Sequence, residues 1–306
     1  MKILHDIAEY RPSGCFLTVT LGNFDGVHLG HRRLLESAVN AAKRAHGRSL
    51  LFTFWPHPAE VLGNNVPPLL TDRAEKARLA EAAGIDYLLE QPFTPELAAL
   101  SPADFTARYL AGTLKANLLV VGYNFRFGRG GAGTAEVLRD LASSHGIETL
   151  IVPPLEMDGA AVSSSRIRQL LLAGELAEAN RLLGREYVLT GLVAPGEKLG
   201  RKLGFPTANL QPSQGMLLPC FGVYAAYAEC RGKKWPAVVN VGRRPTVGDA
   251  LPATVEAHLL SAEGDFYGEM MRLMFYQKIR PERKFASLDE LKAQIAADCR
   301  RAWEIL

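Results

Sequence analysis

The sequence predicts an α/β domain with a parallel β-sheet at residues 1–184, followed by a small antiparallel β-barrel with a C-terminal helix at residues 185–306. In the first half, short apolar runs alternate with segments of helical periodicity, which is typical of a parallel sheet with helices on both faces. From about Tyr187 onward, short strands and Gly/Pro turns replace that alternation. A length of 306 residues also favours two domains over one core.

The first half predicts its elements in the order strand, turn, helix. Apolar runs predict strands at residues 16–21, 49–54, 86–89, 117–122 and 147–152. Capping patterns predict helices that begin near Asp72 and Ser101, and a further helix spans residues 135–144. In a parallel sheet ligands bind beyond the carboxyl ends of the strands, so the segments that follow the strands are the candidate sites.

A glycine-rich turn with two histidines connects the first strand to its helix. Residues 22–31 read G-N-F-D-G-V-H-L-G-H, and the glycines remove side chains where a phosphate would approach the backbone. The turn leads into a helix N-terminus, which favours anions. His28 and His31 are spaced to share one helix face and can donate to phosphate oxygens. The alternatives are capping or packing histidines, or metal ligands, although no third ligand at helical spacing is evident.

Three later segments follow predicted strands or begin a helix. T-F-W-P-H-P at residues 53–58 places His57 after the second strand, where a proline-stiffened loop is the alternative. G-Y-N-F-R-F-G at residues 122–128 places Asn124 after the fourth strand, and Phe125 is expected to pack. S-S-S-R-I-R at residues 163–168 opens a helix that its serines can cap, and its arginines suit phosphate, Arg166 first.

The second half predicts a closed barrel of five or six strands. Strand-like runs occupy residues 187–193, 222–228, 235–241, 254–260 and 271–276. Residues 287–290 form a capping box for the last helix, and the side chains of this helix that are expected to cover the barrel are Leu291, Ile295, Ala296 and Trp303. A nucleic-acid-binding barrel would alternate basic and aromatic residues on one face, and this pattern is not found.

The segment G-R-K-L-G-F-P-T-A-N-L at residues 200–210 is the second strong signal. Its glycines and cations suit a loop that covers phosphates. Thr207 and Asn209 offer two neutral oxygens that suit a Mg²⁺ ion keeping most of its waters. The alternative is that both residues are structural parts of a turn.

The composition predicts an ordinary cytoplasmic globular protein. Apolar residues make up 48%, charged residues 22%, and the net charge of +3 is too small to indicate a nucleic-acid partner. The N-terminus lacks a signal-peptide pattern, and no apolar run reaches the roughly 20 residues of a membrane-spanning helix. The four cysteines are scattered without a C-x-x-C pair, which indicates reduced thiols.

The motif at residues 22–31 resembles the HxGH signature of the nucleotidyltransferase superfamily, in the form found in bacterial bifunctional riboflavin kinase/FAD synthetases. Residues 200–210 resemble the riboflavin kinase signature, and residues 240–246, 267–268 and 280–288 are similar to the same family. The resemblance spans nearly the whole chain and concerns both halves independently. It implies a Rossmann-like nucleotidyltransferase (FMN adenylyltransferase) domain and a riboflavin kinase barrel.

The resemblance also implies roles for single residues. In adenylyl transfer, His28, His31 and Arg166 stabilise phosphates, and the residues expected to line the nucleotide site are Gly22, Asn23, Phe24, Asp25, Gly30, His57, Asn124, Ser163, Ser164 and Arg168. In the kinase, Glu256 is the catalytic base, Thr207 and Asn209 hold Mg²⁺, and the expected substrate contacts are Gly200, Lys202, Gly204, Pro206, Asn240 and Arg243. The chain departs from the family at Ser165, where threonine is common, and after Leu260, where aspartate is frequent.

The implied function is phosphorylation of riboflavin to FMN by ATP, then adenylylation of FMN to FAD by a second ATP with release of pyrophosphate. The expected partners are these small molecules, without nucleic acid or membrane, and the sequence leaves open whether the chain forms a homo-oligomer. One alternative is an HxGH transferase with a pantetheine or cytidyl-type acceptor, against which the second domain argues. The other is a flavin- or RNA-holding barrel fused to an inactive transferase, against which the intact histidine pair and P-T-A-N string argue.

Overall fold

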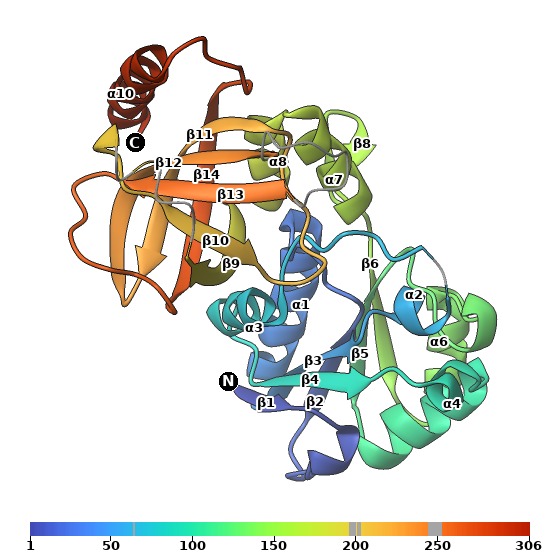
Figure 1. Ribbon diagram of the computed structural model, residues 1–306. Helices are drawn as coiled ribbons and strands as arrows, with labels where there is room; N and C mark the ends of the chain where they lie inside the picture. Colours follow the sequence, from blue (N-terminus) through green and yellow to red (C-terminus); the bar gives the residue numbers. More distant parts are fainter. Residues whose placement is uncertain (64, 196–199, 201–202, 244–252) are drawn as a thin grey trace. The chain divides into compact units, whose positions relative to one another are not determined.

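The computed structural model describes residues 1–63, 65–195, 200, 203–243 and 253–306 (Figure 1). It divides into two compact units, of which the first comprises Met1–Pro67 and Arg73–Val162 and the second comprises Pro68–Asp72 and Ser163–Leu306. This division by packing groups residues 163–184 with the barrel, and the domain boundary after Gly184 stays a prediction.

The first unit is built on a six-stranded sheet in which every strand pair is parallel, as predicted. The strand order is β1-β4-β3-β2-β5-β6. The strands are β1 (Lys2–Leu4), β2 (Leu17–Leu21), β3 (Arg48–Trp55), β4 (Tyr87–Pro92), β5 (Leu118–Gly122) and β6 (Glu148–Val152), and a hairpin of β7 (Glu156–Met157) and β8 (Ala160–Ala161) follows. The sequence did not predict β1, because three residues are too few to show a period of two.

Helices cover both faces of this sheet (Figure 1). On one face α1 (Leu29–Arg44) and α3 (Arg73–Ala82) pack Leu35 and Leu79 against strand residues such as Leu51. On the other face Phe105 and Leu138 belong to the cluster around β2, β3 and β5. The helices of that second face are α4 (Pro95–Ala98), α5 (Pro102–Phe105), the wider helix η2 (Thr106–Thr113) and α6 (Ala135–Ser143), and the short helices η1 (Ile7–Glu9), α2 (Pro58–Val61) and η3 (Arg129–Gly131) complete the unit.

The second unit is a closed antiparallel barrel of six strands, in the order β10-β13-β12-β11-β14-β9. The elements are α7 (Ser164–Ala173), α8 (Leu176–Leu183), β9 (Tyr187–Ala194), β10 (Ala208–Pro212), β11 (Gly222–Cys230), β12 (Lys233–Arg243), β13 (Ala253–Leu259), β14 (Met270–Arg280) and α10 (Leu288–Ile305). Large buried rings fill the barrel, where Tyr224 and Tyr187 both lie against Phe275. The barrel confirms the predicted class, and β10 is the strand that the sequence analysis treated as a turn.

A short segment of chain between β3 and α3 also belongs to the second unit. The amide of Leu69 donates to the carbonyl of Gly215 at 2.7 Å, and the carbonyl of Leu69 accepts from the amide of Leu217 at 2.8 Å. The carboxylate of Asp72 accepts hydrogen bonds from the hydroxyls of Thr190 and Ser213. Residues 68–72 therefore interrupt the first unit and complete the second.

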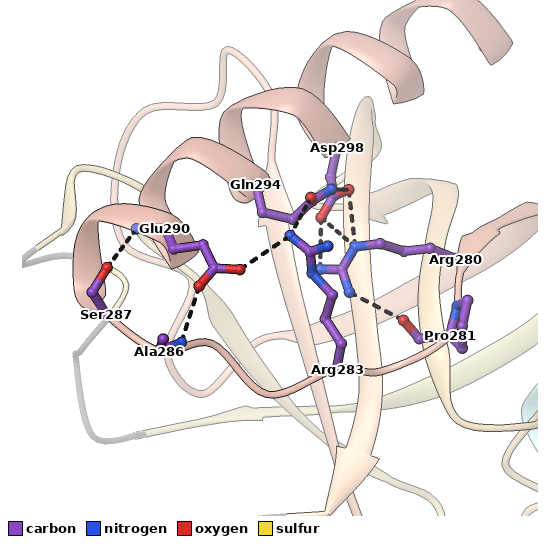
Figure 2. Close-up of polar contacts among 8 residues, drawn as sticks. All are labelled: Arg280, Pro281, Arg283, Ala286, Ser287, Glu290, Gln294 and Asp298. Carbon is purple, nitrogen blue, oxygen red and sulfur yellow. Dashed lines mark hydrogen bonds and ion pairs between the residues drawn. The ribbon is translucent and has the colours of Figure 1, made fainter.

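The C-terminal helix is held to the preceding loop by a network of polar contacts (Figure 2). Ser287 caps the helix by accepting from the amide of Glu290, as the capping box predicts, while the Glu290 carboxylate accepts from the amide of Ala286 at 3.0 Å. Further along the helix, the buried carboxylate of Asp298 accepts from Arg280 at 2.8 Å and from Gln294 at 2.7 Å.

The residues by which the C-terminal helix packs on the barrel differ in part from those expected. Ala302 is buried in a cluster with Val223 and Val238, and Leu291, Ile295 and Ala296 are half-buried. The expectation for Trp303 is wrong, because its side chain is 54% exposed. Ala302 already occupies the inward direction, and the next residue lies about 100° around the helix.

Candidate functional site

The turn at residues 22–28 leaves the carboxyl end of β2 and is buried from Phe24 to His28, whereas Asn23 is exposed. Phe24 and Val27 are each 1% exposed and adopt left-handed backbone angles, with φ of +49° and +37°. A Cβ atom at Gly22 would lie 3.1 Å from the Phe24 ring, and one at Gly30 would lie 3.1 Å from the His28 ring. At these two positions the absence of a side chain therefore makes room for rings of the same segment, a packing role that the sequence analysis did not include.

The two histidines lie together but occupy different backbone positions. His28 is the N-cap of α1, where its Nδ1 accepts from the amide of His31 at 3.2 Å. The capping alternative is thus right for His28, which precedes the helix rather than sharing a face within it. The two rings stack with centroids 3.7 Å apart. Because Nδ1 accepts a hydrogen bond, the neutral His28 ring carries its proton on Nε2, from which it can donate.

Residues from three other elements converge on Asn23. Its carbonyl accepts from Thr53 Oγ1 of β3 at 3.2 Å and from Lys76 Nζ of α3 at 2.8 Å. Its side-chain amide lies 3.4 Å from Nε2 of His57, whose Nδ1 caps α2 by accepting from the amide of Ala59. The structure therefore brings His57 to the histidine-bearing turn. Sequence reasoning missed Lys76, which carries no motif signal.

Asp25 and Asn124 complete the predicted residues of the first unit. Asp25 is buried, at 4% exposed. Asn124 is exposed just beyond β5. Its Oδ1 lies 3.3 Å from the point where a Cβ atom would stand if Gly122 carried a side chain. Phe125 packs against the core of the sheet, as expected.

The serine and arginine residues at the start of α7 belong to the second unit. Ser163 is the N-cap of α7 and accepts from the amide of Arg166 at 3.3 Å, and Ser164 is the first residue of the helix. The guanidinium of Arg166 lies 3.6 Å from the carboxylate of Glu178. Nε of Arg168 donates to the carbonyl of Pro68 at 2.7 Å, so part of this side chain holds the segment at residues 68–72.

In the barrel, strand register aligns the predicted kinase residues across three neighbouring strands. Glu256 of β13 is directly opposite Asn209 of β10 on one side and Asn240 of β12 on the other. Directly paired residues in antiparallel strands share a face, with Cβ atoms about 4.5–5.5 Å apart. These three are half-buried, while flanking residues such as Val255 and Ala257 are buried inside the barrel. The candidate kinase site is therefore on the outer face of the barrel wall.

The segment before β10 is fastened to β13 and to Gly200. The ring nitrogen Nδ1 of His258 lies 2.8 Å from the carbonyl of Pro206, and the Phe205 ring meets the His258 ring edge-on at 5.5 Å. A Cβ atom at Gly200 would lie 2.4 Å from the carbonyl of Phe205 and 3.3 Å from the hydroxyl of Thr207. Sequence reasoning assigned no role to His258, although it lies two residues after Glu256.

Some of the predicted kinase residues are described only in part. Gly204 has a φ of +88°, a backbone angle that favours glycine. Arg243 is the last residue of β12, and its side chain lies outside the description. Lys202 and residues 244–246 of the predicted motifs lie outside the described residues.

The donors around Asn209 fit a hard cation. A threonine hydroxyl, an amide oxygen and a carboxylate oxygen are ligand types that Mg²⁺ accepts while keeping several waters. Gly200 leaves open the space beside the Thr207 hydroxyl that any side chain would enter. No cluster of three or more His, Cys, Asp or Glu residues that could hold a metal occurs among the described residues.

The fold combines an α/β unit that bears the HxGH motif with an antiparallel β-barrel that bears the P-T-A-N string. Family models match both parts, one described as FAD synthetase over residues 12–166 and one as riboflavin kinase over residues 183–306. The chain belongs to the bifunctional riboflavin kinase/FMN adenylyltransferase family. It carries the riboflavin kinase and FMN adenylyltransferase activities that convert riboflavin to FMN and FAD.

Named relatives agree with this assignment over nearly their whole length. The chain is 38% identical to the bifunctional riboflavin kinase/FMN adenylyltransferase of Escherichia coli strain K12, covering 96% of this chain and 94% of the relative. It is 37% identical to the enzyme of the same name from Pseudomonas fluorescens, covering 97% and 96%. A crystal structure titled as a macrolide-efflux protein from Streptococcus pneumoniae superposes with a TM-score of 0.88 at 31% identity, covering 98% and 97%.

Two further observations concern the setting of the protein. Among the described helices, none has the length and apolar character needed to cross a bilayer. The four cysteines are Cys15, Cys220, Cys230 and Cys299, and all of them are free thiols.

Proposed function

We propose that Glu256 is the general base of the kinase reaction and that Thr207 and Asn209 hold Mg²⁺. The carboxylate of Glu256 accepts the proton of the riboflavin 5′-hydroxyl, whose oxygen forms a bond to the γ-phosphorus of ATP while the bond to the departing ADP oxygen breaks. When bound, Mg²⁺ offsets negative charge on the phosphates. The observation that carries this assignment is the register that puts Asn209 and Asn240 directly beside Glu256.

The backbone around Asn209 supports the same assignment. The contacts from His258 to Pro206 and from Gly200 to Phe205 hold the strand entry that presents Thr207. Phosphoryl transfer depends on positioning and electrostatics more than on covalent chemistry, so a rigid entry of this kind favours the reaction. The predicted contacts of Gly204, Pro206, Asn240 and Arg243 with ATP or flavin belong to this proposal.

The adenylyl transfer is assigned to the histidine-bearing turn together with Arg166. A phosphate oxygen of FMN attacks the α-phosphorus of a second ATP, and pyrophosphate leaves. Because two anions meet, donors aimed at the developing charge contribute most. The Nε2–H group of His28, the ring of His31 and the N-terminus of α1 supply such donors in the first unit. The guanidinium of Arg166 is the cation proposed for the leaving phosphates.

The cellular setting is part of the proposal as well. Four free thiols favour a reducing compartment, and we assign the protein to the cytoplasm on this ground together with its family.

One incubation with two variants tests the site assignments. Purified protein is mixed with riboflavin, ATP and Mg²⁺, and the flavins are separated over time; FMN is expected first and FAD after it. Glu256→Gln is expected to stop FMN formation while FAD still forms from added FMN. Asp265→Asn, a change of a carboxylate on the loop after β13, serves as the matched control and is expected to leave both steps intact. FMN formation by Glu256→Gln at the normal rate would remove Glu256 from the role of base.

A further inference from the structure

We propose that Lys76 is a positioning residue for adenylyl transfer, because it fastens the histidine-bearing turn in the shape that presents His28. Lys76 lies on α3, far along the chain from the HxGH motif, and no motif includes it. The inference rests on the proposed role of His28, and its test separates the two.

The ammonium group of Lys76 reaches the turn from α3. Its side chain is 9% exposed, and Nζ donates to the carbonyl of Asn23 at 2.8 Å. Thr53 Oγ1 donates to the same carbonyl at 3.2 Å, so one backbone oxygen takes two donors from two different elements. A lysine ammonium is rarely buried without a specific electrostatic reason, because desolvation disfavours its charge.

The charged groups around Lys76 act on its pKa in opposite directions. Burial lowers its pKa, and Arg73 lowers it further, whereas the carboxylates of Asp25 and Glu90 oppose the shift. Glu90 is itself paired with Arg73 at 2.6 Å. Asp25 belongs to the turn and is 4% exposed, so Lys76 donates to the carbonyl of Asn23 and also interacts electrostatically with a buried carboxylate of the same turn.

The backbone of the turn needs such an anchor. Phe24 and Val27 hold left-handed backbone angles that cost energy for residues other than glycine. Strained conformations persist only where surrounding contacts over-determine them. The residue after Val27 is His28, so a relaxation of the turn moves the ring that is proposed to donate to the phosphates.

The test compares Lys76→Met with Lys76→Arg. Methionine keeps the length of the side chain and removes the ammonium, whereas arginine keeps a cationic donor. Lys76→Met is expected to lower kcat for FAD formation from FMN about 10- to 100-fold, with a smaller change in the KM for ATP, because displacement by about 1 Å costs up to this factor. Lys76→Arg is expected to recover most of the loss. Lys43→Met, at an exposed lysine of α1, is the matched control and is expected to behave as the wild type.

Two readouts separate positioning from general destabilisation. The riboflavin kinase activity of each variant reports the integrity of the other unit, and hydrogen exchange of the peptide covering residues 22–31 is expected to increase in Lys76→Met. Equal rates of FAD formation in Lys76→Met and wild type would overturn the inference, as would equal losses in the methionine and arginine variants. If His28→Ala leaves FAD formation intact, the proposed role of His28 fails. If His28→Ala loses FAD formation while Lys76→Met keeps it, only the inference about Lys76 fails.

Discussion

Replacement of His28 by alanine removes two interactions that can be separated. The first is the N-cap, in which Nδ1 accepts from the amide of His31 at 3.2 Å, together with the stacking of the two rings. The second is the Nε2–H donor that we assign to the phosphates. The first interaction contributes to stability and the second to the rate of adenylyl transfer, so the two effects are expected in different measurements.

The magnitudes predict which effect dominates. Loss of an N-cap costs about 0.5–2 kcal/mol, against a total stability of about 5–15 kcal/mol for a typical domain. The variant therefore stays folded, and its kinase activity is expected to remain near that of the wild type. Loss of one preorganised donor slows a step that develops negative charge by about 10²–10³-fold. FAD formation is therefore expected to fall by that factor in His28→Ala.

A second variant separates the cap from the donor. Asparagine is a good N-cap residue but lacks the imidazole, so His28→Asn is expected to recover the thermal midpoint while FAD formation stays low. The assay is FAD formation from added FMN, with FMN formation from riboflavin measured in the same samples. An equal loss of both activities in a folded His28→Ala protein would refute the assignment to separate sites, and full activity of His28→Asn would refute the donor role.

Three further predictions concern stability, titration and metal. Asp298→Ala leaves the Arg280 guanidinium without its buried carboxylate partner and is expected to lower the free energy of unfolding by about 3–5 kcal/mol in denaturant titrations. Glu304→Ala, which removes an exposed ion pair, is expected to lower it by less than about 1 kcal/mol. Similar losses in the two variants would contradict this prediction. Burial raises the pKa of Cys299 to about 11, so little of this thiol is ionised at pH 8. Alkylation of Cys299 is therefore expected to be roughly 10²-fold slower in the native than in the unfolded protein. Equal rates of alkylation in the two states would contradict this prediction. Chelation by EDTA is expected to stop FMN formation until Mg²⁺ is added back, and undiminished formation in excess EDTA would exclude a metal requirement.

The sequence predicts most of the elements whose patterns are local. The parallel strands are short apolar runs, and Ser101, Thr134 and Ser287 cap helices with side chains that immediately precede them. The histidine pair is likewise local, and its motif lies where the strand meets the helix. Such features depend on neighbours within a few residues, which is why the linear pattern contains them.

Features that depend on distant partners could not be read in this way. Strand β10 follows Pro206 and ends at Pro212, so its alternation of buried and half-buried residues is short and bounded by residues that suggest turns. The alignment of Asn209 with Glu256 arises only when the barrel closes. Lys76 and His258 were missed for the same reason, since each contacts a backbone carbonyl that is remote in the sequence.

Because residues 68–72 belong to the second unit, they affect how this enzyme can be divided into separate fragments. A fragment that starts at Ser163 would contain all six barrel strands but would lack the backbone partner of Leu217 and the carboxylate that receives the hydroxyls of Thr190 and Ser213. Cutting the chain once therefore cannot yield two intact halves. The second unit is discontinuous in the sequence, and a split version that keeps these contacts would have to return residues 68–72, for example as a tethered peptide, to the isolated unit.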